Sequence, residues 1–210
     1  MRLTTILFVF LVLGVLPATI QSATLLSENF DELTAALAQT SVGQFSTIDG
    51  TNVDIVNGSF CAAPESGNCV DMDGTGGNSQ GVLQSNSSFL LVPGTSYFLS
   101  YDLIGSQRGV TASTTVSFGP YTQTFVLLSG DDSTGIVTNQ LVTVSSPTTT
   151  FLTFASNTPG NIGNLLDDVL ITSSAANSVP EPSGTILVAS GLLLGWAVLA
   201  FRRRRKTIFQ

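Results

Sequence analysis

The side chains that could do chemistry in this chain are almost all carboxylates. Thirteen of the fourteen acidic residues but only one of the seven basic residues, Arg108, lie between residues 24 and 173, which therefore carry a formal charge of −12. The stretch has no histidine and no lysine, so a Ser-His-Asp triad, a Cys-His pair or a Schiff base cannot be built. Carboxylate pairs could still hydrolyse glycosides; the candidates are Asp71, Asp73, Asp102, Asp131 and Asp132.

We expect no enzyme, because acidic pairs on β-loops more often form turns or bind metal ions. The same charge makes nucleic acid and anionic lipid poor partners and metal cations plausible ones. The loop 71–81 begins like an EF-hand, with Asp71 and Asp73 alternating, but Val82 stands where that motif has its glutamate, so a turn between strands is expected there.

Arg108, in the segment 106–109, is open to two interpretations. In so acidic a stretch we expect it to neutralise a nearby carboxylate. The alternative is a bidentate contact with the carboxylate of an acidic sugar.

Cys61 and Cys69 are the two cysteines of the chain. A metal site would need more thiols or a histidine, and a reactive thiol would lack an adjacent base. In an exported protein, a disulfide closing a short loop is expected.

The pattern of residues 24–173 predicts an all-β, two-sheet sandwich of the jelly-roll type. Tyr97, Leu99, Tyr101 and Leu103 share one strand face by alternation. One short helix is expected over 31–39, which begins with acidic residues. The expected strands are 25–31, 51–57, 81–92, 96–105, 111–119, 121–128, 140–146, 148–156 and 164–172.

Both ends of the chain are expected to lie outside this domain. Residues 1–23 have the layout of a secretory signal peptide. Residues 174–184 form a polar tether, 185–201 an uncharged helix of about 26 Å that barely spans a bilayer, and 202–210 a basic tail that stays cytoplasmic. The basic residues there are Arg202, Arg203, Arg204, Arg205 and Lys206. The alternative interpretation of this tail is a permanent single-span membrane anchor.

The order of features at the end resembles the PEP-CTERM sorting signal of Gram-negative bacteria. The motif is Val179, Pro180, Glu181, Pro182 and Ser183, followed by the apolar span and the arginines. The resemblance implies that a membrane-embedded exosortase removes the tail. The protein would then cross the inner membrane, stay anchored briefly and end in the envelope, on the surface or outside the cell.

The domain itself resembles the jelly-roll domains of the choice-of-anchor group and, more distantly, galactose-binding-like carbohydrate modules. The segments that carry the likeness are 53–60, 70–85, 92–109 and 161–172. In such modules the first and last strands are adjacent and often hold a structural calcium. The resemblance implies Glu28 and Asp168 as ligands, with Asp31 and Asp167 less directly matched.

These observations together predict an exported, non-enzymatic envelope or extracellular-matrix protein associated with exopolysaccharide. The resemblance alone implies the exopolysaccharide. The alternatives are a carbohydrate-binding module for a specific glycan and a polysaccharide-active enzyme that uses paired carboxylates.

Overall fold

The computed structural model describes residues 21–175, apart from 59, 62–66 and 77–79. The chain divides into two compact units, and the described residues belong to the unit Ile20–Ala176. The predicted sorting motif, the span 185–201 and the basic residues 202–206 lie outside the described residues, as does most of the predicted signal peptide. Among the residues that the structure does describe, no helix has the length and hydropathy needed to cross a bilayer.

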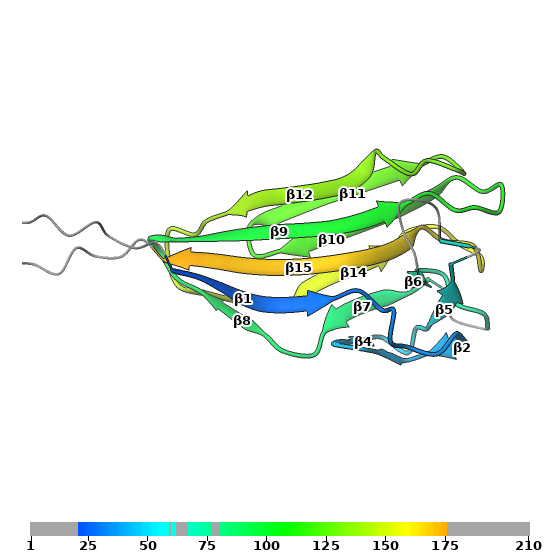
Figure 1. Ribbon diagram of the computed structural model, residues 1–210, viewed down its shortest axis with the longest axis horizontal. Helices are drawn as coiled ribbons and strands as arrows, with labels where there is room; N and C mark the ends of the chain where they lie inside the picture. Colours follow the sequence, from blue (N-terminus) through cyan, green and yellow to red (C-terminus); the bar gives the residue numbers. More distant parts are fainter. Residues whose placement is uncertain (1–20, 59, 62–66, 77–79, 176–210) are drawn as a thin grey trace, which may run out of the picture. The chain divides into compact units, whose positions relative to one another are not determined.

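The described domain is all-β and consists mainly of two antiparallel sheets (Figure 1). The first sheet has the order β12-β9-β15-β6-β5-β2, and β1 also pairs with β15. The second has the order β11-β10-β14-β7-β4-β3, and β13 and β8 form a separate pair. The strands are β1 (Gln21–Glu28), β2 (Ala36–Gln39), β3 (Ser41–Val42), β4 (Phe45–Thr47), β5 (Val53–Asn57), β6 (Asn68–Asp71), β7 (Val82–Ser85), β8 (Phe89–Leu91), β9 (Thr95–Ile104), β10 (Ala112–Phe118), β11 (Tyr121–Leu127), β12 (Gly135–Val142), β13 (Thr148–Thr150), β14 (Leu152–Ser156) and β15 (Leu165–Ala175).

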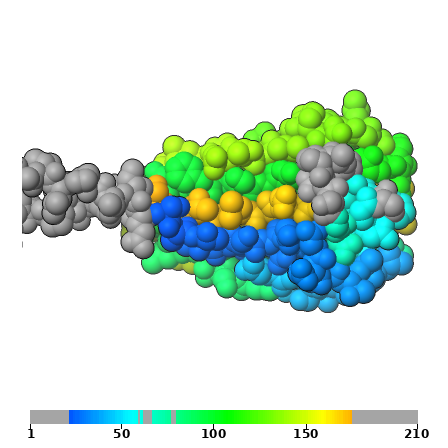
Figure 2. Space-filling model, in the orientation of Figure 1, coloured from blue at the N-terminus to red at the C-terminus, as the bar shows by residue number. Residues whose placement is uncertain are grey.

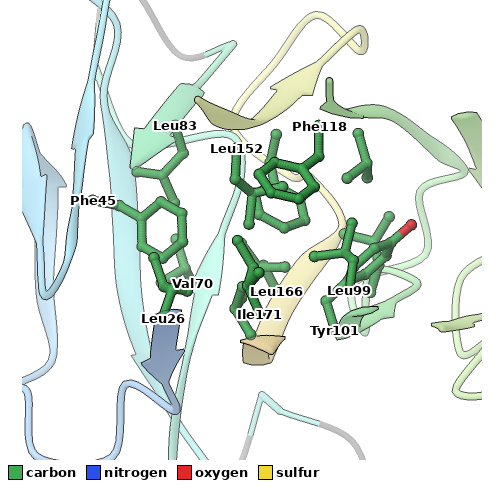
Figure 3. Close-up of a cluster of buried hydrophobic side chains, with 14 of the residues drawn as sticks. Leu26, Phe45, Val70, Leu83, Leu99, Tyr101, Phe118, Leu152, Leu166 and Ile171 are labelled. Atoms are coloured by element: carbon green, nitrogen blue, oxygen red, sulfur yellow. The ribbon is translucent and has the colours of Figure 1, made fainter. Parts of the chain in front are cut away.

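The space between the two sheets is filled by one large apolar cluster (Figure 3). The alternation predicted for β9 is confirmed, because Tyr97, Leu99, Tyr101 and Leu103 are all buried in this cluster. The Tyr101 ring makes an edge contact with the Phe154 ring of the opposite sheet, with 5.4 Å between centroids. Such contacts between aromatic rings fix how the sheets sit on each other.

The helix expected over 31–39 is wrong. A turn follows Phe30, and β2 pairs with β5 from Ala36 onward. Phe30 and Ala38 have positive φ values of 56° and 53°, which an α-helix does not accommodate. A nine-residue helix is marginal on its own, whereas Ala38 donates its N–H to the carboxylate of Asp54 at 2.7 Å. Tertiary hydrogen bonding therefore overrides the local helical preference.

The first and last strands are adjacent, as expected. β1 pairs with β15 from Gln21↔Ala175 to Glu28↔Val169. The two ends of the described domain therefore lie together at one end of the sandwich (Figure 1).

The last strand contains a bulge that changes which side chains face the core. Asp168 has a φ of 47°, and the register with β9 shifts between Asp167 and Leu170. Leu166 and Val169 are consequently both buried in the core, while Asp168 is exposed. Simple alternation places Leu166 and Asp168 on one face, which is wrong because the bulge adds a residue. At this bulge the neighbour of β15 changes from β6 to β1.

Candidate functional site

A cleft opens where β5, β6, the end of β9 and the start of β15 meet. These parts of the strands lie at the end of the sandwich opposite to the start of β1 and the end of β15 (Figure 1). Its cavity volume is about 280 Å³, near the lower limit of roughly 300 Å³ for small-molecule sites. The lining residues are Leu37, Asp54, Val56, Phe60, Asp71, Thr75, Ser106, Gln107, Arg108, Gly163 and Leu165. In the space-filling view of Figure 2, β1 (blue) lies beside β15 (orange) on the visible face of the domain.

Arg108 forms an ion pair with Asp71 in this cleft. The guanidinium Nη2 donates to Asp71 Oδ2 and to the carbonyl of Asn161, the latter at 2.8 Å. The Arg108 side chain keeps 37% of its surface exposed, whereas that of Asp71 keeps 2%. The expectation that Arg108 neutralises a nearby carboxylate is confirmed.

The backbone before Arg108 is held by a short network of hydrogen bonds. The Arg108 N–H donates to Ser106 Oγ at 3.1 Å, and Ser129 Oγ donates to the Ser106 carbonyl at 2.6 Å. The Gly109 N–H in turn donates to Ser129 Oγ at 2.9 Å. The arginine therefore extends from a loop whose position is fixed by a neighbouring loop.

Asp71 ends β6 and is buried beneath the guanidinium. Its Oδ1 accepts the N–H of Asp73 at 3.0 Å and the N–H of Gly163 at 2.8 Å. Burial raises the pKa of Asp71 to about 6, although both of these N–H groups and the charge of Arg108 act to lower it. Gly163 allows this close approach, because a Cβ there would lie 2.7 Å from the backbone nitrogen of Asp73.

Asp54, on β5, is the second carboxylate of the cleft. Its Oδ1 accepts the N–H of Ala38 at 2.7 Å and of Thr75 at 2.9 Å, and its Oδ2 accepts the Thr75 hydroxyl at 2.7 Å. Both oxygens are thus engaged with the protein. Asp54 and Asp71 are the only cleft-lining carboxylates among the described residues.

The apolar wall of the cleft includes Leu37 and Phe60, which are 61% and 46% exposed. Phe60 follows β5 in a turn where its N–H donates to the Asn57 carbonyl at 2.9 Å. The next residue, Cys61, is joined to Cys69 of β6 by a disulfide, which confirms the predicted pairing. The disulfide fixes the segment that carries Phe60 close to β6.

The remaining glycosidase candidates do not gather at the cleft. Asp73 is buried behind Asp71, and Asp102 lines a different hollow. Asp131 accepts the N–H groups of Ser133 and Thr134, and these bonds lower its pKa. It therefore stabilises a turn.

The four predicted calcium ligands lie around the junction of β1 and β15. A hollow of about 300 Å³ there is lined by residues that include Glu28, Asp102 and Asp168. Burial raises the pKa of Asp168, and the charges of Asp102 and Asp31 raise it further. Calcium at this junction stays a prediction.

Three of these carboxylates already accept hydrogen bonds. Glu28 accepts the N–H of Phe30 at 3.2 Å and of Gln44 at 2.8 Å. Asp31 accepts from the side chain of Asn29 and from the backbone of Asn68, and Asp167 accepts the N–H of Asp168. Among the described residues, no group of three or more His, Cys, Asp or Glu side chains is arranged to hold a metal ion.

Sequence reasoning did not assign to a site four of the residues that line the cleft, namely Leu37, Asp54, Phe60 and Thr75. The one usable signal was Asp54, an acidic residue between Val53 and Ile55 in an otherwise apolar strand. All three residues are buried, and a buried carboxylate requires polar partners. No sequence pattern indicates that Leu37 and Phe60 meet.

Comparison with known proteins yields distant structural neighbours. No protein-family model matches the chain, and no curated protein matches it. One similar structure is the K3 adhesin domain of Lys-gingipain from Porphyromonas gingivalis, at 17% identity and a TM-score of 0.46, covering 71% of this chain and 99% of that one. Another is a xylan-binding domain from Paenibacillus barcinonensis, at 16% identity and a TM-score of 0.44, covering 76% of this chain and 99% of that one. At these values neither neighbour assigns a ligand to this chain.

Proposed function

We propose that this chain is an exported, non-enzymatic protein of the cell envelope or extracellular matrix that binds a neutral glycan of exopolysaccharide in the Arg108 cleft. The observation that carries the proposal is the combination of apolar and polar side chains that line the cleft. Leu37 and Phe60 offer exposed apolar surface, while Asp54, Asp71 and Arg108 offer polar groups. A sugar ring has the matching character, with an apolar face and hydroxyl groups at its edge, and ligand sites generally combine apolar walls with a few polar groups.

A neutral glycan suits the charge of the domain better than an acidic one. Residues 24–173 carry a formal charge of −12, which repels a polyanion. Asp71 already occupies the guanidinium of Arg108, so an acidic sugar would compete with a buried carboxylate for this cation. Hydroxyl groups need only hydrogen bonds.

Export and anchoring are supported by three features of the chain. The Cys61–Cys69 disulfide fits an oxidising compartment. Residues 1–23 resemble a signal peptide, and residues 179–206 resemble a PEP-CTERM signal. Within the described domain, the end of β15, which precedes that signal in the sequence, lies at the end of the sandwich opposite to the cleft (Figure 1).

Glycan binding is tested with the full chain, purified in mild detergent. The ligands are neutral polysaccharides such as xylan and β-glucan, the exopolysaccharide of the producing organism, and alginate as an acidic polymer. Leu37→Ser is expected to weaken binding to the neutral ligand at least tenfold. Leu90→Ser is the matched control, because Leu90 is 63% exposed on β8, away from the cleft lining. Equal binding by the two variants would overturn the proposal for this cleft.

Two further arms separate the alternatives. Preferential binding of alginate, lost in an Arg108→Ala variant, would instead support the contact of Arg108 with an acidic sugar. Release of reducing ends from a polysaccharide, abolished by Asp71→Asn, would establish an enzyme and contradict the proposal.

A further inference from the structure

A second group of polar side chains is buried behind the cleft, between the two sheets. It consists of Asp73, which follows β6, Thr114 of β10, Ser156 of β14 and Asn164, which precedes β15. Asp73, Thr114 and Asn164 are 0% exposed and Ser156 is 7% exposed. None of the four lines the cleft.

Gly163 lies between this group and the cleft. A Cβ at this position would lie 3.0 Å from Asp71 Oδ1 and 3.1 Å from Asp73 Cγ. Asp71 therefore lies on the cleft side of Gly163, where it pairs with Arg108, and Asp73 lies on the side toward the buried group. The two carboxylates have different surroundings although they are two positions apart.

The four buried residues are linked to one another. The Asn164 side chain donates from Nδ2 to Thr114 Oγ1 at 3.0 Å. Thr114 and Ser156 are register partners on adjacent strands, and the Ser156 hydroxyl is close enough to Asp73 to lower its pKa. The Met72 N–H donates to the Asn164 carbonyl at 3.0 Å, which holds the two loops together.

Three oxygen atoms of this group have no partner in the described part of the chain that meets the distance and the angle of a hydrogen bond. They are both carboxylate oxygens of Asp73 and Oδ1 of Asn164. Buried polar atoms are almost always satisfied, and an unpaired buried carboxylate is costly. Burial is the largest effect on the pKa of Asp73 and raises it to about 6, as expected of a carboxylate held away from water.

We propose that Asp73 and Asn164 bind a hard cation, such as calcium or sodium, in this buried group, with the Ser156 hydroxyl as a further ligand. All the side-chain atoms available as ligands are oxygens, and oxygen ligands select hard cations over the metals that prefer nitrogen or sulfur. A cation would satisfy the three unpaired oxygens at once and balance the buried charge.

The site has one carboxylate, that of Asp73, and its other oxygen ligands are neutral. It is separate from the predicted calcium site at the junction of β1 and β15, which involves Glu28 and Asp168. It is also independent of whether the cleft binds a glycan.

The test measures the melting temperature of the full chain in mild detergent after chelation and transfer into a sodium-free choline buffer. Calcium is titrated in one arm, and in the other sodium chloride replaces choline chloride at constant ionic strength. We expect at least one ion to raise the melting temperature of the wild-type chain by several degrees, since a ligand of the native state stabilises it. Asp73→Asn should abolish this increase.

Asp168→Asn is the control for the junction of β1 and β15. The ion effect should persist in Asp168→Asn and disappear when Asp73→Asn is added to it. An effect that is lost in Asp168→Asn and kept in Asp73→Asn would overturn the proposal. Equal responses of the wild type and Asp73→Asn to both ions would do so as well.

A measurement that needs no variant covers the case in which Asp73→Asn fails to fold. The wild-type chain is dialysed against calcium or against sodium, and the bound ion is counted by elemental analysis. We expect about one equivalent per chain of the ion that stabilises it. Less than a tenth of an equivalent of either ion would contradict the site.

Discussion

Arg108 and Asp71 are 37 positions apart in the chain, yet they form an ion pair in which the carboxylate is buried and the guanidinium half-exposed. The pair depends on the sheet, because β6 and β9 both pair with the start of β15. It also covers the loop of Gly163, whose N–H donates to Asp71 at 2.8 Å. The Arg108–Asp71 pair therefore both lines the cleft and helps to hold this end of the sandwich together.

Removing the guanidinium should destabilise the fold. Arg108→Gln leaves Asp71 buried without its cation, and breaking a buried pair costs roughly 3–5 kcal/mol. Because Arg108 is 37% exposed, water compensates in part, and we expect the free energy of unfolding to fall by about 2 kcal/mol. Urea unfolding measures the change.

The matched control for this prediction is the double variant Asp71→Asn/Arg108→Gln. It removes both charges and should recover at least half of the loss, since no unpaired charge stays buried. A loss in Arg108→Gln that the second change leaves unaltered would mean that the guanidinium acts through its bond to the Asn161 carbonyl instead.

The stability of the metal-free protein should depend on Asp73 between pH 4 and pH 7. Burial raises the pKa of Asp73 from 3.8 to about 6 in the folded state. Between these two pKa values the folded state holds a proton that the unfolded state releases, so protonation of Asp73 favours folding at low pH. This contribution to the free energy of unfolding is lost as the pH rises to 6 and above. We expect Asp73→Asn to gain about 2 kcal/mol relative to the wild type over this range. Urea unfolding in chelator-treated, sodium-free buffer gives the difference, and a constant difference would contradict the prediction.

The pattern predicted β9 and β10 closely because each buries a regular face, whereas the expected strand 140–146 overlaps only the last residues of β12. β9 alternates from Ser96 to Leu103 and β10 over all seven of its residues, and alternation of this length is hard to produce by chance. β2, β3, β4 and β6 were missed, since none exceeds four residues and too few residues are present to show a period. The bulge at Asp168 was missed because a positive φ at an aspartate leaves no mark in the sequence.

The candidate site was predictable only in its electrostatics. A single cation among thirteen acidic residues predicts an ion pair but not its partner, which the register of β6 and β9 with β15 selects. The disulfide was predictable from the number and spacing of the cysteines. The exposed apolar residues Leu37 and Phe60 have no periodic context, so only the three-dimensional structure places them together.

Loss of the disulfide should affect both stability and the cleft. Cys61 and Cys69 close a loop with a sequence separation of 8, and a loop of this length corresponds to about 2–3 kcal/mol of stability. Cys61 follows Phe60 of the cleft wall, and Asp71 comes two positions after Cys69. We expect Cys61→Ser/Cys69→Ser to unfold at lower urea concentration and to bind the neutral glycan more weakly than the wild type.

A reducing agent provides the control for this prediction. It should lower the stability of the wild type to that of Cys61→Ser/Cys69→Ser and leave the variant unchanged. Undiminished glycan binding by folded Cys61→Ser/Cys69→Ser would contradict the prediction, because it would show that the cleft wall does not depend on the disulfide.

The last prediction concerns the C-terminal processing that the resemblance to a sorting signal implies. The apolar stretch 185–201 reaches about 26 Å as a helix, less than the roughly 30 Å of the hydrocarbon core, which suits a temporary hold better than a lasting anchor. We expect mass spectrometry of the mature protein to find the chain ending near Pro180–Ser183. Replacing Pro180 and Pro182 with alanine should leave the uncut precursor in the membrane fraction, whereas Ser178→Ala, just outside the motif, should be processed normally. A mature protein that retains Arg202–Lys206 would contradict sorting and establish a permanent membrane anchor, which the five cations would hold in the membrane with its C-terminus in the cytoplasm.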